Sequence, residues 1–592
     1  MKFNSFAKTI AGAAVALLVA GCGGGSGDVI GAAPQTPPPA APVASLQLSG
    51  TAATGLALAS AAVQVKCATG DGTATTLASG VYEVTIVGGT LPCMIRVTGT
   101  VDGTPVTMHS VTEAGTADAA TGRTSAVANV TPLTEIVIAQ LTGAVPSALF
   151  ASFSQGSAAV ITSEKLAAAT TAVLTALETA TGVDVTIADP FKAPLVAATS
   201  PTATGNAHDQ LLDALDIKPQ ALPQLANQVA TAAASGSTAG LQDAMAAVDA
   251  GTLPGCPAMP GGKYRVLEYF GASYVRNLDF KAMTISRLDG TGTLPITVDA
   301  AKPCEFKAAG NTGTTEVQLD FVMGTGGVGA FRIQNLTAGR SNIAYLFPVQ
   351  SHTLSELVGE WTFHQGGFMP GEGFRHMAGK AGIAANGAVS ICDFDLLSNP
   401  WSTCTPDTDA AGLAAAARTD GGFNLTQGGV VGASVWGYRA PNGTLTLFGT
   451  TNEAGSTAGT DEQTTLVLSK FSTQPLPAVG NVTNYWDVAL VRQAGAGVGQ
   501  NITSVVADTT TVLSVDAAAS TVVSRRGSDS REASVKYNVP LPGLRHRPAQ
   551  TFNGSPVSEV YQFPIQGAGI VLSVNTVPAA STHIYNVSVV RP

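Results

Sequence analysis

The chain has 592 residues, carries a formal net charge of −10, and contains 45% hydrophobic but only 12% charged residues. At about 100–200 residues per domain this length predicts several domains, and no apolar run after residue 21 approaches the ~18 residues of a membrane-spanning helix. The acidic balance excludes a nucleic-acid partner, because phosphate binding needs a basic face. The two basic clusters, Arg525-Arg526 and Arg545-His546-Arg547, are expected to be solvated loop charges.

The N-terminal segment has the features of a secretory signal peptide. Two early lysines precede an apolar run at residues 10–20, and the sequence Val-Ala-Gly-Cys follows, ending at Cys22. This sequence resembles the lipobox of bacterial lipoproteins. The resemblance implies that residues 1–21 are removed and that Cys22 becomes an acylated N-terminus, which anchors the protein to a membrane.

Residues 22–44 are expected to form a tether, because the Gly-rich stretch is flexible and the Pro-rich stretch after it is extended. In bacterial lipoproteins, Asp directly after the acylated cysteine commonly means retention at the inner membrane. Gly23 stands there in this chain. The resemblance therefore implies the outer membrane, and it leaves open whether the protein faces the periplasm or the cell surface.

Residues 45–128 are predicted to form a β-sandwich. Val63 and Val65 alternate with polar residues, as do the apolar residues at 82, 84 and 86, which predicts strands with one buried face. The segments SGT at residues 49–51 and ASGVYEV at residues 78–84 are similar to carboxypeptidase regulatory-like domains. That resemblance implies a small, noncatalytic, transthyretin-like sandwich.

Six cysteines remain after Cys22 is assigned to lipid. An even number of cysteines in an oxidising compartment favours disulfides, and pairing within predicted domains favours three bridges: Cys67–Cys93, Cys256–Cys304 and Cys392–Cys404. A zinc site is the alternative, but the chain has no Cys-x-x-Cys motif.

Residues 129–252 change to helical periodicity. Thr131-Pro132 predicts a helix start, because Thr caps the first turn and Pro has no N–H to leave unpaired. Apolar residues at helical spacing follow in three later segments: Leu166, Val173 and Leu177; Leu211, Leu212 and Leu215; Leu241, Met245 and Val248. The region is predicted to be an Ala-rich helical bundle.

Residues 253–592 return to the periodicity of strands. Asp289-Gly290, Asn386-Gly387 and Asn442-Gly443 each separate alternating apolar segments, which predicts hairpins. A glycine, a charge and an aromatic residue open the segments at 262–264 and 359–361, and a weaker copy surrounds Trp486. This pattern predicts two or three related antiparallel units, which are either sandwiches or barrels.

The predicted fold is therefore multidomain and mainly β, with an α-helical middle. The expected divisions are the signal peptide (1–21), the tether (22–44), the regulatory-like sandwich (45–128), the helical region (129–252) and three β units (253–352, 353–478 and 479–592).

One group of residues has the chemistry of a metal or catalytic site: Glu360, His364, Glu372 and His376. Imidazole nitrogens and carboxylate oxygens are ligands that zinc or nickel takes. However, no regular spacing places the four on one face, and glycines between them predict a loop. A polar loop that joins two strands is the favoured interpretation, so we expect no catalytic residue, no bound metal and no cofactor.

The tripeptide Gly359-Glu360-Trp361 resembles the Gly-x-Trp strand of lipocalin-like barrels, whose cup holds small apolar ligands. The resemblance makes Trp361 a candidate residue for a ligand cavity. A tryptophan that plugs the core of the unit is the alternative and favoured interpretation.

The chain has no nucleophile elbow and no phosphate loop. The sequence therefore favours a noncatalytic, lipid-anchored protein of the cell envelope that binds or scaffolds another envelope protein or a glycan. One alternative is a carrier of a small apolar ligand in a C-terminal barrel, which needs an apolar cavity of ~300–1,000 Å³. A second alternative is an extracytoplasmic hydrolase with a site near residues 360–376, which needs the two histidines and a carboxylate to converge.

Overall fold

The computed structural model describes residues 44–101, 103–187, 189–369, 373–395, 411–451, 463–492, 501–552, 554–575 and 582–591. The predicted signal peptide and the tether up to residue 43 lie outside these ranges. Three of the predicted site residues also lie outside them: Cys22, Glu372 and Cys404.

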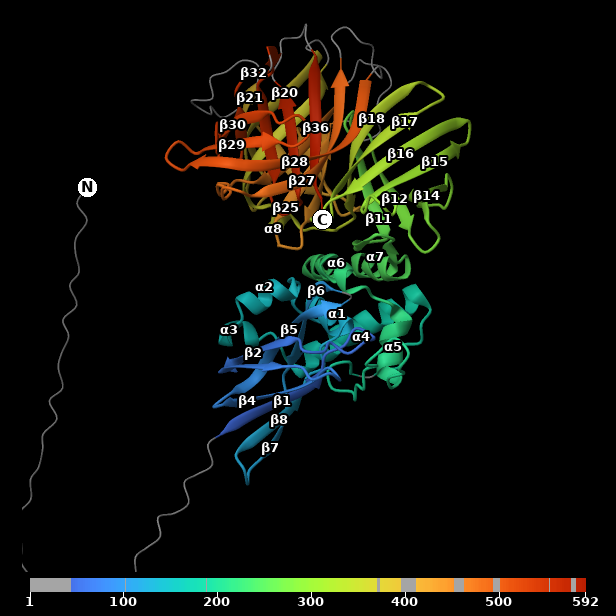
Figure 1. The fold of residues 1–592 in the computed structure, drawn as a ribbon, viewed down its shortest axis with the longest axis vertical. Helices are drawn as coiled ribbons and strands as arrows, with labels where there is room; N and C mark the ends of the chain where they lie inside the picture. The colour runs from blue at the N-terminus through green and yellow to red at the C-terminus, as the bar shows by residue number, and fades with distance from the viewer. Residues whose placement is uncertain are drawn as a thin grey trace, which may run out of the picture. The chain divides into compact units, whose positions relative to one another are not determined.

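The first described segment forms two four-stranded sheets with the orders β4-β1-β8-β7 and β3-β2-β5-β6 (Figure 1). The strands are β1 (Ser45–Thr51), β2 (Ala62–Thr69), β3 (Asp71–Thr75), β4 (Val81–Val87), β5 (Thr90–Val101), β6 (Thr104–Thr112), β7 (Thr116–Asp118) and β8 (Arg123–Val127). The alternation predicted along the chain is present, since Tyr82, Val84 and Ile86 of β4 are buried and their neighbours are exposed.

Helices follow, as the change of period predicts. They are α1 (Pro132–Thr142), α2 (Pro146–Ala151), α3 (Gln155–Ala158), α4 (Ser163–Thr181), α5 (Ala207–Leu215), the 3-10 turn η1 (Pro219–Ala221), α6 (Leu222–Ser235) and α7 (Thr238–Asp249). The predicted helix start is confirmed: Thr131 caps α1 and its side chain accepts a hydrogen bond from the Thr134 N–H. The helices and both sheets share one continuous hydrophobic core, in which Leu48, Ile136 and Val173 are buried together.

A short pair, β9 (Thr252–Leu253) and β10 (Cys256–Pro260), precedes a closed barrel. This first barrel contains β11 (Gly262–Glu268), β12 (Ser273–Asp279), β13 (Thr284–Arg287), β14 (Leu294–Val298), β15 (Glu305–Thr312), β16 (Thr315–Met323), β17 (Gly329–Asn335) and β18 (Arg340–Pro348). Asp289-Gly290 lies in the turn between β13 and β14, as predicted.

The short helix α8 (Leu354–Leu357) leads into an eight-stranded sheet of order β21-β20-β19-β26-β25-β24-β23-β22. Its strands are β19 (Gly359–Met369), β20 (Gly373–Ile383), β21 (Val389–Asp395), β22 (Leu413–Ala417), β23 (Phe423–Gln427), β24 (Val430–Arg439), β25 (Leu445–Thr450) and β26 (Gln463–Lys470). An isolated bridge between Ala388 and Ala414 brings the two edges together, so the sheet curls into a cup. The two other predicted turns, Asn386-Gly387 and Asn442-Gly443, also join paired strands.

The last segment forms a second closed barrel, which we call the third β unit (orange and red in Figure 1). Its strands are β27 (Val482–Arg492), β28 (Asn501–Asp516), β29 (Thr521–Arg526), β30 (Glu532–Tyr537), β31 (Arg545–Arg547), β34 (Val560–Ile565), β35 (Ile570–Asn575) and β36 (His583–Val590), with the separate pair β32 (Gln550–Phe552) and β33 (Ser555–Val557). The prediction that the basic clusters are loop charges is wrong. Arg525 and Arg526 end β29, and Arg545 to Arg547 form β31.

The predicted fold class is confirmed: the described chain is mainly β with helices in the middle. The sequence leaves sandwiches and barrels as alternatives for the C-terminal units, and the first and third units are closed barrels. The aromatic residues of the three predicted openings, Tyr264, Trp361 and Trp486, are all buried in the first strand of their unit. The exact domain divisions stay a prediction, because residues 43–592 form one compact unit.

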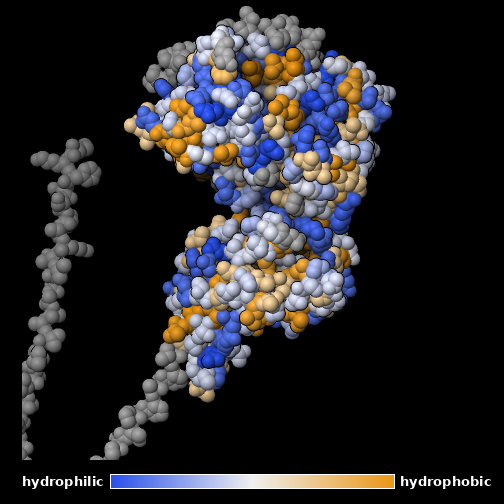
Figure 2. Space-filling model, in the orientation of Figure 1, coloured by the Kyte–Doolittle hydropathy of each residue, from blue (hydrophilic) through white to orange (hydrophobic). Residues whose placement is uncertain are grey.

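Among the described residues, no helix has both the length and the apolar character needed to cross a bilayer. On the face drawn in Figure 2, hydrophobic and hydrophilic side chains are interspersed.

Candidate functional site

The sheet β19–β26 encloses a cavity of about 380 Å³. Successive side chains of a strand point to opposite faces, so alternate residues of each strand form the wall. Phe363 of β19, Leu425 of β23 and Leu447 of β25 are among them, and none of the described lining residues carries a formal charge. The volume lies within the ~300–1,000 Å³ typical of small-molecule sites.

The polar side chains of this lining already have protein partners. The Gln365 amide donates to Thr464 Oγ1 at 3.0 Å, and the Gln427 amide donates to the Ala411 carbonyl at 3.0 Å. Thr451 Oγ1 lies 2.9 Å from Thr464 Oγ1. The cavity therefore offers apolar contact rather than unsatisfied hydrogen-bonding groups.

Trp361, the candidate ligand residue, is fully buried beside this cavity and is not among the residues that line it. It lies two residues before Phe363, and thus on the same face of β19. Its Nε1–H donates to the Leu357 carbonyl at 2.8 Å, and Lys470 Nζ lies 3.9 Å from the centre of its ring. These contacts hold the indole as part of the core of the sheet.

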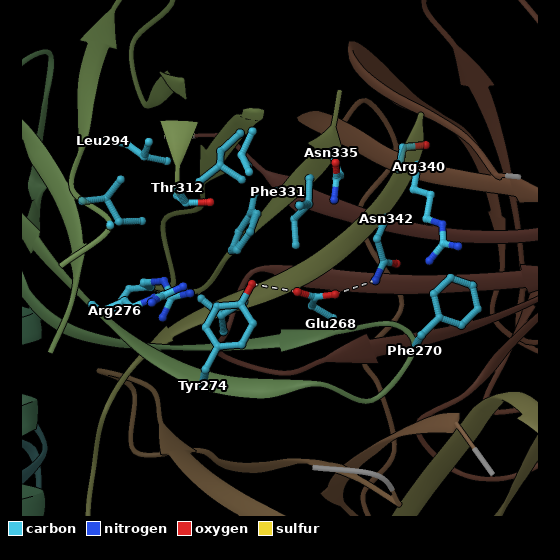
Figure 3. A pocket seen from close by; sticks show the side chains of 18 of the residues that line it. Glu268, Phe270, Tyr274, Arg276, Leu294, Thr312, Phe331, Asn335, Arg340 and Asn342 are labelled. Atoms are coloured by element: carbon cyan, nitrogen blue, oxygen red, sulfur yellow. Dashed lines mark hydrogen bonds between the residues drawn. The ribbon is translucent and has the colours of Figure 1, made fainter. Parts of the chain in front are cut away.

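The first barrel holds a different cavity, of about 410 Å³, which has charged groups in its wall. Figure 3 shows Tyr274 and Asn342 pointing toward Glu268 from two sides. The Tyr274 hydroxyl donates to Glu268 Oε1 at 2.8 Å, and the Asn342 amide donates to Oε2 at 2.9 Å. Burial raises the pKa of Glu268, and these two hydrogen bonds offset part of that rise.

Three guanidinium groups, those of Arg276, Arg287 and Arg340, share this lining with that one carboxylate. The Arg276 guanidinium lies 4.1 Å from the centre of the Tyr274 ring. Burial lowers the pKa of Arg276, and the positive charge of Arg287 also acts against it. With apolar side chains such as Phe331 in the same wall, the first barrel offers both charge and apolar contact.

The structure brings together His364 and His376, two of the four metal or catalytic candidates. They lie on the paired strands β19 and β20, with His364 Nε2 3.3 Å from His376 Nδ1, and both side chains are buried. The prediction of a polar loop is therefore wrong for these residues. Gly366 pairs with His376 across the two strands. A Cβ at residue 366 would lie 2.5 Å from His376 Nδ1, so the close approach of the ring requires glycine at this position.

The carboxylates do not join this histidine pair. Glu360 is exposed, and its Oε1 lies 2.5 Å from Lys380 Nζ, whereas Glu372 falls outside the described residues. Within the described ranges, no group of three or more His, Cys, Asp or Glu side chains has the arrangement of a metal site. Burial lowers the pKa of His376 to about 3 and the pKa of His364 well below its ordinary value of 6.5, so both rings are neutral near pH 7.

The described cysteines lie in disulfides. Cys67 is bonded to Cys93, and Cys256 is bonded to Cys304, which are two of the three pairs expected from the sequence. Cys392 is also disulfide-bonded, while its expected partner, Cys404, lies outside the described residues.

The sequence reasoning missed the residues that line the cavities. Leu425, Leu447 and Glu268 sit at alternating positions of strands, and that alternation is visible in the sequence. It shows which residues share a face, but it does not show whether that face surrounds a filled core or an open cavity.

In comparisons with known proteins, no protein-family model and no curated protein matches this chain. Similar solved structures include a double mutant of transferrin binding protein B from Haemophilus parasuis, at 9% identity and a TM-score of 0.20. That match covers 54% of this chain and 65% of the other. The chain thus spans less than two thirds of that protein.

Two further matches also have low identities and low TM-scores. Transferrin binding protein B from Neisseria meningitidis matches at 10% identity and a TM-score of 0.19, with 54% of this chain and 66% of the other covered. A protein of unknown function from the DUF3598 family of Nostoc punctiforme matches at 12% identity and a TM-score of 0.14, with 40% and 97% covered. At such TM-scores the likeness supports no conclusion about what this chain does.

Proposed function

We propose that the protein is a noncatalytic, lipid-anchored binding protein of the bacterial cell envelope, and that it holds a small apolar ligand in the cavity of the sheet β19–β26. The observation that carries the proposal is the uncharged lining of this cavity, together with its volume of about 380 Å³. Both agree with what a carrier of an apolar ligand needs, which is an apolar cavity of ~300–1,000 Å³.

The lining chemistry selects the class of ligand. An apolar molecule that enters the cavity removes its own surface and that of Phe363, Leu425 and Leu447 from water, which is worth about 25 cal/mol per Å². A charged or strongly polar molecule would lose its hydration there. Since Gln365 and Gln427 are already hydrogen-bonded, nothing in the described lining would compensate for that loss.

A neutral fluorescent probe tests the cavity. We expect N-phenyl-1-naphthylamine to bind the full chain saturably, with one site per chain. Ala433→Phe, at a buried position of the lining, is expected to fill the cavity and to weaken binding about tenfold or more. The measurement is a fluorescence titration, with circular dichroism to verify that the variant is folded.

The matched control is Val431→Phe, at an exposed position of the same strand, β24, that does not line the cavity. It also introduces a phenyl ring, but outside the cavity, so it should leave the affinity unchanged within about twofold. Equal weakening by both substitutions, or equal affinity of all three proteins, would contradict the cavity as the binding site.

The proposed anchor gives a second prediction. Cys22→Ser removes the sulfur that would carry the lipid, so the variant should move from the detergent phase to the aqueous phase in a Triton X-114 separation. Wild-type protein should carry fatty acid by mass spectrometry and, because Gly rather than Asp follows Cys22, should fractionate with outer membranes. A variant that still enters the detergent phase would show that this cysteine is not the anchor.

A further inference from the structure

The third β unit is polar on its inside, in contrast to the sheet before it. Along β27, Tyr485 and Asp487 line an internal cavity of about 350 Å³, while Trp486 and Val488 on the other face are buried in the hydrophobic core. The alternation repeats on β36, where Asn586 lines the cavity. These two strands thus keep an apolar face for packing and turn hydrogen-bonding groups toward the internal space, which is also lined by the apolar residues Val512, Val522 and Val535 of other strands.

Four guanidinium groups line this cavity, those of Arg526, Arg531, Arg545 and Arg547. Two of them are balanced by nearby carboxylates. The Arg526 Nε–H donates to Asp508, and Asp529 Oδ2 lies 3.8 Å from Arg531 Nε. These pairs neutralise one side of the barrel interior.

The two guanidinium groups of β31 have no such balance. Arg545 donates through Nε to Gln474 Oε1 at 2.9 Å, and its guanidinium lies 4.4 Å from the centre of the Tyr537 ring. Arg547 donates through Nη2 to the Ser558 carbonyl at 2.6 Å, while its Nη1 is buried without a hydrogen-bond partner. Neither forms an ion pair with a carboxylate within the ranges that the structure describes.

Half-buried positive charge of this kind is costly unless a negative charge faces it. Burial and the charge of Arg531 lower the pKa of Arg547 to about 10, and the charge of Glu559 offsets part of that fall. Even so, the group is cationic near neutral pH. No described carboxylate forms an ion pair with either guanidinium, and Glu559 acts on Arg547 only through its charge, so both groups are available to an anion in the cavity.

We propose that the interior of the third β unit binds a small polar anion, whose carboxylate or phosphate oxygens are held by the Arg545 and Arg547 guanidinium groups. Guanidinium recognises both kinds of oxyanion through paired N–H donors. Gln562 and Ser573 line the same cavity and add neutral hydrogen-bonding groups. The volume admits a small molecule and excludes a folded partner.

This site is separate from the apolar cavity of the sheet β19–β26, and none of the described residues lines both. The anion site therefore does not depend on the proposed function. A variant that loses anion binding but still binds N-phenyl-1-naphthylamine would show that the two sites are independent.

The test is calorimetric titration of the full chain at low ionic strength with two probes, citrate and inorganic phosphate. Saturable binding of citrate alone assigns the site to carboxylates, and binding of phosphate alone assigns it to phosphates. Arg547→Gln is expected to lower the affinity for the anion about tenfold or more, because it removes a charge-assisted contact. Arg547→Lys keeps the charge but loses the planar fork, so its affinity should fall between the two.

The matched control is Arg525→Gln, which removes the same charge from an exposed position on β29 of the same barrel. It should change the affinity by no more than about twofold. If Arg547→Gln fails to fold, Ser573→Phe fills the same cavity without altering its charge and should abolish binding. The proposal is overturned if neither probe binds, or if Arg525→Gln weakens binding as much as Arg547→Gln.

Discussion

Between pH 7 and about pH 5, the free energy of unfolding is expected to fall by about 2 kcal/mol through His376, and His364 is expected to lower it further. Burial lowers the pKa of His376 to about 3 and that of His364 well below its ordinary value of 6.5. The charge of a protonated His376 also disfavours protonation of His364, and that of His583 disfavours protonation of His376.

The direction follows from proton binding. Between about pH 6.5 and pH 3, the unfolded chain binds a proton at His376 and the folded chain does not, and the lowered pKa of His364 acts in the same direction. Acid therefore favours the unfolded state. His376 contributes about 2 kcal/mol at pH 5, where the free energy of unfolding changes by about 1.4 kcal/mol per pH unit through this ring.

Urea unfolding, followed by tryptophan fluorescence at pH 7 and pH 5, measures this difference. The double variant His364→Leu, His376→Leu should lose at least about 2 kcal/mol of the pH dependence. Little hydrogen bonding is lost in it, because His364 Nδ1 and His376 Nε2 have no partner in the described structure. His583 is present in both proteins and cancels. An unchanged pH dependence in the double variant would show that the pair titrates normally.

Local rules of the chain are enough to predict many of its elements. Asp289-Gly290 and Asn442-Gly443 turn where the predicted hairpins require, and Thr131 caps the helix that it was expected to begin. These features depend on the conformational preferences of a few neighbouring residues, so a single sequence is enough to predict them.

The histidine pair marks where such rules end. His364 and His376 become neighbours because β19 and β20 pair in a register that places Gly366 opposite His376. A hairpin centred near residue 371 would have predicted this proximity. The glycines between them instead favoured a loop, although packing against the two imidazole rings is what requires Gly366 to lack a side chain.

The polar cavity of the third β unit shows a second limit. The alternation of Tyr485 and Asp487 with Trp486 and Val488 predicts a strand with two unlike faces. In an isolated barrel the apolar face would turn inward. Here it is buried in a core shared with the neighbouring β strands, so the polar face turns inward instead. Which face of the strand turns inward depends on tertiary packing, and the alternation of residues along the strand does not predict it.

Trp361→Ala is expected to lower the free energy of unfolding by about 3–5 kcal/mol, the usual cost of truncating a buried tryptophan. The indole is fully buried, and it also satisfies the Leu357 carbonyl and lies beneath Lys470 Nζ. Trp361→Phe should lose less, since it keeps an aromatic ring in the core while removing the Nε1–H.

The matched control is Glu360→Ala, at the preceding residue, which faces the opposite side of β19 and is exposed. Its single ion pair with Lys380 predicts a change of no more than about 1 kcal/mol. Urea unfolding at pH 7 compares the three variants with wild type. Naphthylamine titration of the folded Trp361→Ala protein then separates the two roles considered for this residue. A large loss of stability with retained binding identifies a core tryptophan, whereas lost binding with unchanged stability would make Trp361 a ligand-contacting residue after all.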